Sequence, residues 1–236
     1  TKLRIASAQL LSYLRKNYPE FILYASTSFE FKTIYEYQSF IMMHPNIKQI
    51  VPSHDVNKNF KLLKNLRKDY KNLEIEIMVN EGCMHGCPHR NLHAGINIDY
   101  DISYNNDLSL STKYCMTYCM NTLKKYPFYS LTLNNNIYPW EIKEYYKIGI
   151  NNFKFVGRDM FTSRIKNYLN DYFLYLKSID NYKIIENEPI TTFIHHLAGC
   201  SELQQLKVKN IKKYLPNINN FKKNGHLCSS RCGIEC

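Results

Sequence analysis

Two pairs of cysteines stand out in this sequence because both have the same spacing. Cys83 and Cys87 are separated by three residues, and so are Cys115 and Cys119. The first pair follows an apolar run, residues 73–79, that is typical of a buried strand, so it lies in the loop where that strand ends. Thiolates are soft ligands that bind zinc or iron–sulfur clusters. The four cysteines therefore predict one metal or iron–sulfur centre held by two loops.

Other arrangements of metal ligands are open on the sequence alone. A mixed zinc site can combine the first cysteine pair with His89 and His93. A second cluster or a zinc ion can be held by the cysteines nearer the carboxyl end, namely Cys200, Cys228, Cys232 and Cys236. Disulfides are the other common use of eight cysteines. The paired spacing and the lack of a visible secretory signal favour reduced thiols, so we expect a cytoplasmic protein.

Charged side chains near the predicted strand ends are candidate catalytic groups. Arg158 follows a strand predicted over residues 152–156, and it can hold an anionic substrate or form a salt bridge that closes the fold. Glu76 lies inside the strand before the first cysteine pair and needs a partner if it points inward. It either orients the cysteine loop or pairs with Arg158. His54 and Asp55 follow another predicted strand and are either acid–base groups or part of an ordinary surface loop.

Alternating strands and helices position these residues. We predict an amphipathic helix over residues 1–18 and, after it, five strands with helices between them. The strands are predicted at 21–25, 47–51, 73–79, 128–133 and 152–156, and the helices at 30–43, 57–70, 136–147 and 161–176. Such alternation indicates an α/β fold with a parallel sheet or barrel. A closed (β/α)8 barrel needs three strands more than these five.

The character of the chain changes near residue 178. Residues 1–178 carry the βα alternation, whereas residues 179–236 contain the second group of cysteines and a charged helix. We therefore predict a barrel portion and a cysteine-containing C-terminal extension with that boundary. Residues 91–113 are rich in Asn, Asp, Ser and Tyr, which predicts a long functional loop inside the first portion.

Composition and motifs narrow the function. The 236 residues carry a net charge of +11, which attracts anionic partners such as nucleic acid, although dispersed lysines are also typical of solvated helix faces. No apolar run approaches the ~20 residues of a membrane span. G-x-S-x-G, H-E-x-x-H, P-loop and C-x3-C-x2-C patterns are absent from the sequence. Serine hydrolase, zincin, kinase and radical-SAM functions therefore have no support.

Three segments, taken in order, resemble the U32 "peptidase" or collagenase-like family. Residues 25–27 (AST) resemble the end of a middle strand in that family. Residues 76–83 (EIMVNEGC), together with the later cysteine pair, resemble its cysteine signature, and residues 153–158 (FKFVGR) resemble its last barrel strand. The resemblance covers roughly residues 1–176. The gap between the first two cysteines is shorter here, which indicates a divergent branch.

The resemblance implies a TIM-like barrel without its first strands and a [4Fe–4S] cluster. The implied ligands are Cys83, Cys87, Cys115 and Cys119. Several members of the family take part in oxygen-independent hydroxylation, which implies RNA or an aromatic small molecule as substrate and an electron donor or partner subunit. The alternative is a noncatalytic zinc-binding module that serves a structural or partner role. A metal-dependent peptidase follows only from the family name.

Overall fold

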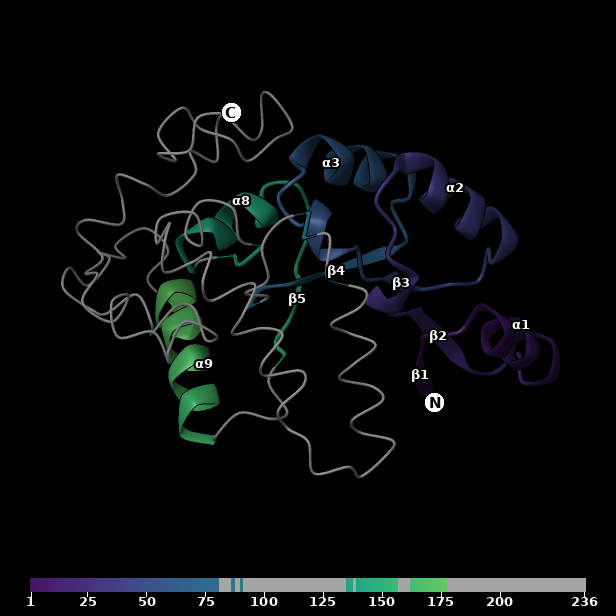
Figure 1. Ribbon diagram of the computed structural model, residues 1–236, viewed down its shortest axis with the longest axis horizontal. Coiled ribbons are helices and arrows are strands. Elements are labelled where there is room, and N and C mark those ends of the chain that lie inside the picture. Colours follow the sequence, from purple (N-terminus) through teal and green to yellow (C-terminus); the bar gives the residue numbers. More distant parts are fainter. Residues whose placement is uncertain (81–85, 88–89, 91–134, 138, 157–161, 178–236) are drawn as a thin grey trace. The chain divides into compact units, whose positions relative to one another are not determined.

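The computed structural model describes residues 1–80, 86–87, 90, 135–137, 139–156 and 162–177 (Figure 1). The chain divides into two units. All described residues except Gly86, Cys87 and Arg90 belong to the first unit, which comprises Thr1–Glu81, Asn135–Tyr182 and Asn217–His226. The fold given below is the fold of this first unit. The domain boundary expected at residue 178 falls at the end of the described residues and stays a prediction.

A five-stranded parallel sheet forms the centre of this unit. Its strands are β1 (Lys2–Ile5), β2 (Ile22–Ala25), β3 (Gln49–Ile50), β4 (Glu74–Met78) and β5 (Asn152–Lys154), and they neighbour one another in sequence order. In doubly wound folds the strand order reverses, whereas barrels keep sequence order throughout. The expected α/β fold with a parallel sheet is therefore confirmed. Closure of this sheet into a barrel stays a prediction.

Helices connect the strands, and their starts are set by capping side chains. The helices are α1 (Ala8–Asn17), α2 (Ile34–Met43), α3 (Phe60–Asp69), α8 (Ile142–Tyr146) and α9 (Thr162–Lys177), with short 3₁₀ helices at Thr27–Phe29, His54–Val56 and Pro139–Glu141. Helix α2 begins later than predicted because Thr33 and Glu36 form a capping box at its start. Asn59 caps α3 by accepting from the N–H of Leu62.

The first residues of the chain correct the prediction of a single helix over 1–18. Residues 2–5 form strand β1, and the helix begins only after Ser7, whose side chain accepts from the N–H of Leu10. Apolar and basic residues alternate along β1, which is the period of a strand and not of a helix. The strand predicted at 128–133 lies outside the described residues.

The two faces of the sheet differ in chemistry. Alternate strand residues supply a large part of the buried apolar core, among them Ile5, Leu23, Ala25, Ile50, Ile75 and Ile77. The helices add Leu11 from α1, Tyr37 and Phe40 from α2, and Leu63 and Leu66 from α3. Burial of each large side chain contributes about 1.5–3 kcal/mol. The register aligns Arg4, Tyr24, Gln49 and Glu74 in one row, so the opposite face of the sheet is polar.

Helix α8 and the 3₁₀ helix before it are joined to the start of α3 by buried groups. The Tyr145 hydroxyl donates to the carbonyl of Asn57 at 2.8 Å, and its ring lies 4.8 Å from the ring of Phe60. Lys58 and Glu141 form an ion pair at 3.2 Å with side chains only 3% and 6% exposed. These contacts fix the segment that leads from residue 135 into β5.

Candidate functional site

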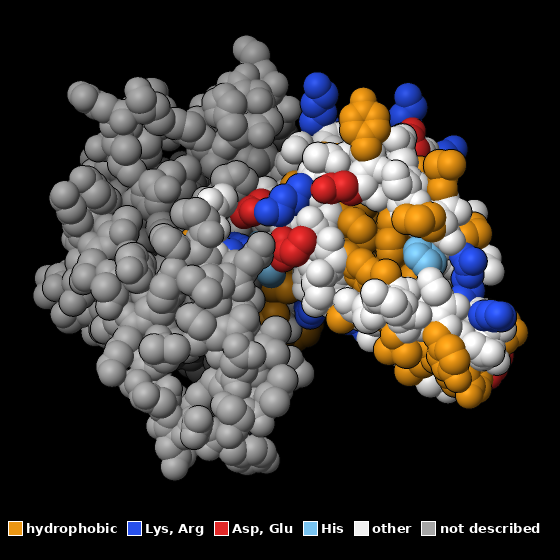
Figure 2. Space-filling view, turned by 45° about the vertical axis from the view of Figure 1, so that its right-hand side comes forward, with side chains coloured by type: hydrophobic (Ala, Val, Ile, Leu, Met, Phe, Trp, Pro, Cys, Tyr) orange, Lys and Arg blue, Asp and Glu red, His pale blue; other side chains and the backbone are white. Residues whose placement is uncertain are grey.

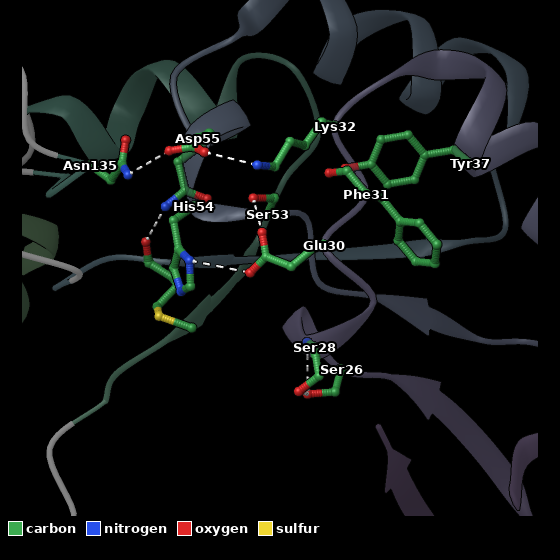
Figure 3. Close-up of polar contacts among 12 residues, drawn as sticks. Ser26, Ser28, Glu30, Phe31, Lys32, Tyr37, Ser53, His54, Asp55 and Asn135 are labelled. Atoms are coloured by element: carbon green, nitrogen blue, oxygen red, sulfur yellow. Dashed lines mark hydrogen bonds and ion pairs between the residues drawn. The ribbon is translucent and has the colours of Figure 1, made fainter. Parts of the chain in front are cut away.

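A cluster of polar side chains lies where β2 and β3 end (Figure 3). We call it the carboxyl-edge cluster, and its members are Glu30 and Lys32 after β2, Ser53, His54 and Asp55 after β3, and Asn135. The carboxyl ends of parallel strands meet at one edge of a sheet, and α/β folds bind their ligands there. The cluster therefore occupies the position where chemistry is expected in this fold.

Glu30 is the centre of the cluster. Ser53 donates its hydroxyl to Glu30 Oε2 at 2.6 Å, and Glu30 Oε1 lies 3.9 Å from Nδ1 of His54. Ser53 is fully buried, and the side chains of His54 and Glu30 are 12% and 33% exposed. The hydrogen bond is short because its acceptor is ionised. The carboxylate is thus held between a hydroxyl and an imidazole, and it remains partly accessible to solvent.

The backbone of Glu30 adopts an unusual conformation. Its φ of 51° and ψ of 36° lie in the left-handed region, and it is the one residue other than glycine with positive φ among those the structure describes. Its N–H donates to the carbonyl of Thr27 at 2.8 Å. A side chain in this region costs roughly 1–2 kcal/mol relative to glycine. Such strain persists only where the surroundings enforce it, and it is concentrated at functional positions.

Asp55 is held by two partners on other segments. Its carboxylate lies 3.2 Å from Lys32 Nζ, and it accepts a hydrogen bond from the side-chain amide of Asn135 at 3.2 Å. One partner is a cation and the other is an amide donor. Asp55 is therefore better suited to holding three segments together than to exchanging protons. Of the two residues that the sequence offered as acid–base groups, His54 faces the carboxylate of Glu30, and Asp55 faces the ammonium of Lys32.

Glu76 lies on the polar face of the sheet and not in the carboxyl-edge cluster. The guanidinium of Arg4 contacts Glu76 through Nη1 and donates to Gln49 Oε1 at 3.1 Å. Gln49 in turn donates to Glu74 at 3.1 Å. The partner of Glu76 described by the structure is thus Arg4, which the sequence analysis did not consider. The alternation of Arg4 with apolar neighbours is the sequence feature that places Arg4 on a strand. The predicted pairing with Arg158 falls on a residue outside the described part.

Asn80 joins the ends of β4 and β5. Its side-chain amide donates to the carbonyl of Val156 at 2.6 Å, and its side-chain oxygen accepts from the N–H of Val156 at 2.8 Å. Asn80 is only 6% exposed. This pair of bonds fixes the point from which the chain leaves β4 toward Cys83. Asn80 has a structural role here that its position in the cysteine motif did not reveal.

Most of the predicted metal ligands lie outside the described residues. Cys87 is described, and its thiol is half-buried and not in a disulfide. The other predicted ligands fall in the undescribed part, and they are Cys83, Cys115, Cys119, His89, His93, Cys200, Cys228, Cys232 and Cys236. Among the residues that the structure does describe, no group of three or more His, Cys, Asp or Glu side chains is arranged to hold a metal ion. The metal and cluster assignments therefore stay predictions.

Comparison of the chain with protein-family models, with curated proteins and with solved structures gives no match. The fold class consequently rests on the structure itself. The structure shows an α/β protein with a parallel sheet in sequence order and a polar cluster at the carboxyl edge. In the part of the chain that is described, no helix has the length and apolar character needed to cross a membrane.

Proposed function

We propose that this chain is an iron–sulfur enzyme similar to the U32 family. Its reaction is an oxygen-independent hydroxylation of RNA or of an aromatic small molecule. The observation that carries the proposal is the carboxyl-edge cluster, which brings a histidine and a carboxylate together at the edge of a parallel sheet. Enzymes with parallel α/β sheets place their catalytic groups at this edge. A zinc-binding structural module has no need of such a pair.

The proposed cluster ligands are Cys83, Cys87, Cys115 and Cys119. Cys87 fits this role because its thiol is half-buried and not in a disulfide. When bound, the cluster supplies electron transfer or a binding point for the substrate. The residues of the chain do the rest: His54 moves a proton, and Arg158 holds an anionic group of the substrate. The net charge of +11 supports an anionic substrate such as RNA.

The test is the content of iron, sulfide and zinc in the full chain purified without oxygen. About four irons and as many sulfides per chain are expected. Cys87→Ala should lose the brown colour and most of the iron, whereas Met84→Ala, a change in the same loop that removes no thiol, should keep both. Zinc without sulfide would contradict the proposal and favour the noncatalytic zinc-binding module.

The substrate class has its own test. RNA binding that persists as salt is raised indicates contacts beyond simple charge, because counterion release weakens purely electrostatic binding steeply. Binding that disappears with moderate salt, together with binding of a phenolic compound, would select the aromatic small molecule.

A further inference from the structure

We propose that a hollow between α1, β2 and the loop before β3 binds a small carboxylate with a short apolar tail, such as butyrate. The lining comes from the end of α1, the start of β2 and the residues that precede β3. The hollow therefore lies at the amino edge of the sheet, whereas the carboxyl-edge cluster lies at the other edge. The inference concerns a second site, and it does not depend on the proposed reaction.

Most of the lining is apolar. Its apolar members are Leu11, Pro19, Phe21, Leu23 and Ile47, and the cavity volume is about 40 Å³. Leu11, Leu23 and Ile47 are buried. A water molecule needs roughly 10–15 Å³ of such space, so the hollow holds about three waters or a chain of about three carbons. Figure 2 shows that hydrophobic side chains also gather on the surface over α1 and α2, with basic side chains beside them.

A buried polar group in the lining lacks a partner. His44 is only 7% exposed, and its Nδ1 is buried without a hydrogen-bond partner among the described residues. The ring packs against Phe40, with 4.8 Å between the ring centroids. Buried N–H groups without a partner are rarer in proteins than buried acceptors without one. The proton of the neutral ring is therefore expected on Nε2, which then can donate to a ligand in the hollow.

Arg15 supplies a positive charge beside His44. Its Nη1 donates to the carbonyl of Met43, which is the last residue of α2, and this contact holds the guanidinium next to His44. Arg15 is exposed, so it lies at the mouth of the hollow. Burial, and then the charge of Arg15, lower the pKa of His44, so the imidazole is neutral at about pH 7.

The charges around the hollow favour an anion. The described residues that line it include no Asp or Glu. The carboxyl ends of α1 and α2 carry partial negative charges, but each is smaller than the full charge of Arg15, which already donates to the end of α2. A negative ligand group at the mouth can therefore accept from Arg15 and from Nε2 of His44.

The apolar lining and the basic mouth together select the ligand class. A carboxylate accepts charge-assisted hydrogen bonds at the mouth, and its tail displaces water from the apolar side chains behind it. Inorganic phosphate has no tail to fill the hollow. An uncharged hydrocarbon of the same size leaves Arg15 and His44 without a partner. A monocarboxylate with about three tail carbons satisfies both parts of the lining.

The experiment records the ring signals of labelled histidines by NMR in the full chain, while sodium butyrate replaces sodium chloride at constant ionic strength. His44→Gln identifies the signal of His44. That signal should shift and saturate, and the pKa of His44 should rise, because the bound carboxylate offsets the charge of Arg15. Each CH₂ group removed from a buried tail weakens binding about fourfold, so acetate should bind roughly fifteenfold more weakly than butyrate.

Arg15→Gln should weaken butyrate binding severalfold, because a charged donor is lost. Lys16→Gln is the matched control, since it removes a positive charge from the next position of α1 that does not line the hollow, and binding should not change. A His44 signal that butyrate does not shift would overturn the proposal. Equal binding of acetate and butyrate would also overturn it, because the tail would then make no contact. So would equal binding by the wild type and Arg15→Gln.

Discussion

The buried ion pair between Lys58 and Glu141 should be one of the most sensitive points of the fold. Both side chains are nearly inaccessible, and Lys58 Nζ lies 3.2 Å and 3.3 Å from the two carboxylate oxygens. The pair joins the start of α3 to the segment before α8, two parts of the chain separated by 83 residues. The perturbation is Lys58→Met, which keeps the volume and removes the ammonium.

The expected cost follows from the geometry. At 3.2 Å and an effective dielectric constant of about 20, the attraction between the charges is roughly 5 kcal/mol. Removal of one partner loses this attraction and leaves the other charge buried, for which about 3–5 kcal/mol is typical. A domain of this size is stable by about 5–15 kcal/mol, so the loss is a large share of the total. The double variant Lys58→Met/Glu141→Leu removes both desolvation costs, and it should be close to the wild type or more stable.

The assay is urea unfolding of the full chain followed by circular dichroism. Lys147→Ala is the matched control, since Lys147 pairs with Glu144 at 2.8 Å but its side chain is 63% exposed. That surface pair should contribute about 0–1 kcal/mol. A Lys58→Met variant that loses less than about 1 kcal/mol would refute the reasoning, because the pair would then be solvated like a surface pair. A double variant as unstable as the single variant would also refute it.

Two further predictions concern Asn80 and His44. Asn80→Ala should lower the free energy of unfolding by about 2 kcal/mol and speed amide exchange at Val156, because both hydrogen bonds between the ends of β4 and β5 are lost. Unchanged amide exchange at Val156 would contradict this prediction. Burial, followed by the charge of Arg15, lowers the pKa of His44 below its ordinary value of 6.5. The unfolded chain then binds the proton more readily, so stability is full above about pH 6.5 and falls as the pH drops through this value. Urea unfolding at about pH 7.5 and pH 5.5 should show a larger loss in the wild type than in His44→Gln, and an equal loss would exclude His44 as a cause.

The sequence predicted well those helices and strands whose hydrophobic pattern agrees with the side that is buried in the structure. The helix predicted over residues 57–70 is observed as α3, and Leu62, Leu63 and Leu66 are buried in it. The strand β4 and its exit before Asn80 were also placed correctly. Strand β1 was missed because Leu3 and Ile5 extend the apolar spacing of the following helix, and the short strand is fixed by pairing with β2, a contact that no local pattern reports.

The candidate site was predicted only in part. His54 was found because it follows a strand, and parallel strands bring their carboxyl ends together. Its partner Glu30 lies 24 positions earlier and was assigned to the start of a helix, because the capping box that delays α2 was not recognised. The pairing of Asp55 with Asn135 spans 80 residues. The separations between Glu30 and His54 and between Asp55 and Asn135 match neither the helical nor the strand period. The sequence alone therefore does not reveal that these residues meet.

By itself, the sequence determined the α/β class, the parallel sheet and the edge at which polar residues gather, because these follow from hydrophobic periodicity and from the geometry of consecutive βα units. Tertiary structure alone decided which side chains meet there. The contact of Glu30 with Ser53 and His54 and the contact of Arg4 with Glu76 depend on strand register and on one left-handed backbone position. Register is set by the packing of the whole sheet against its helices, and a shift by one residue would exchange the two faces.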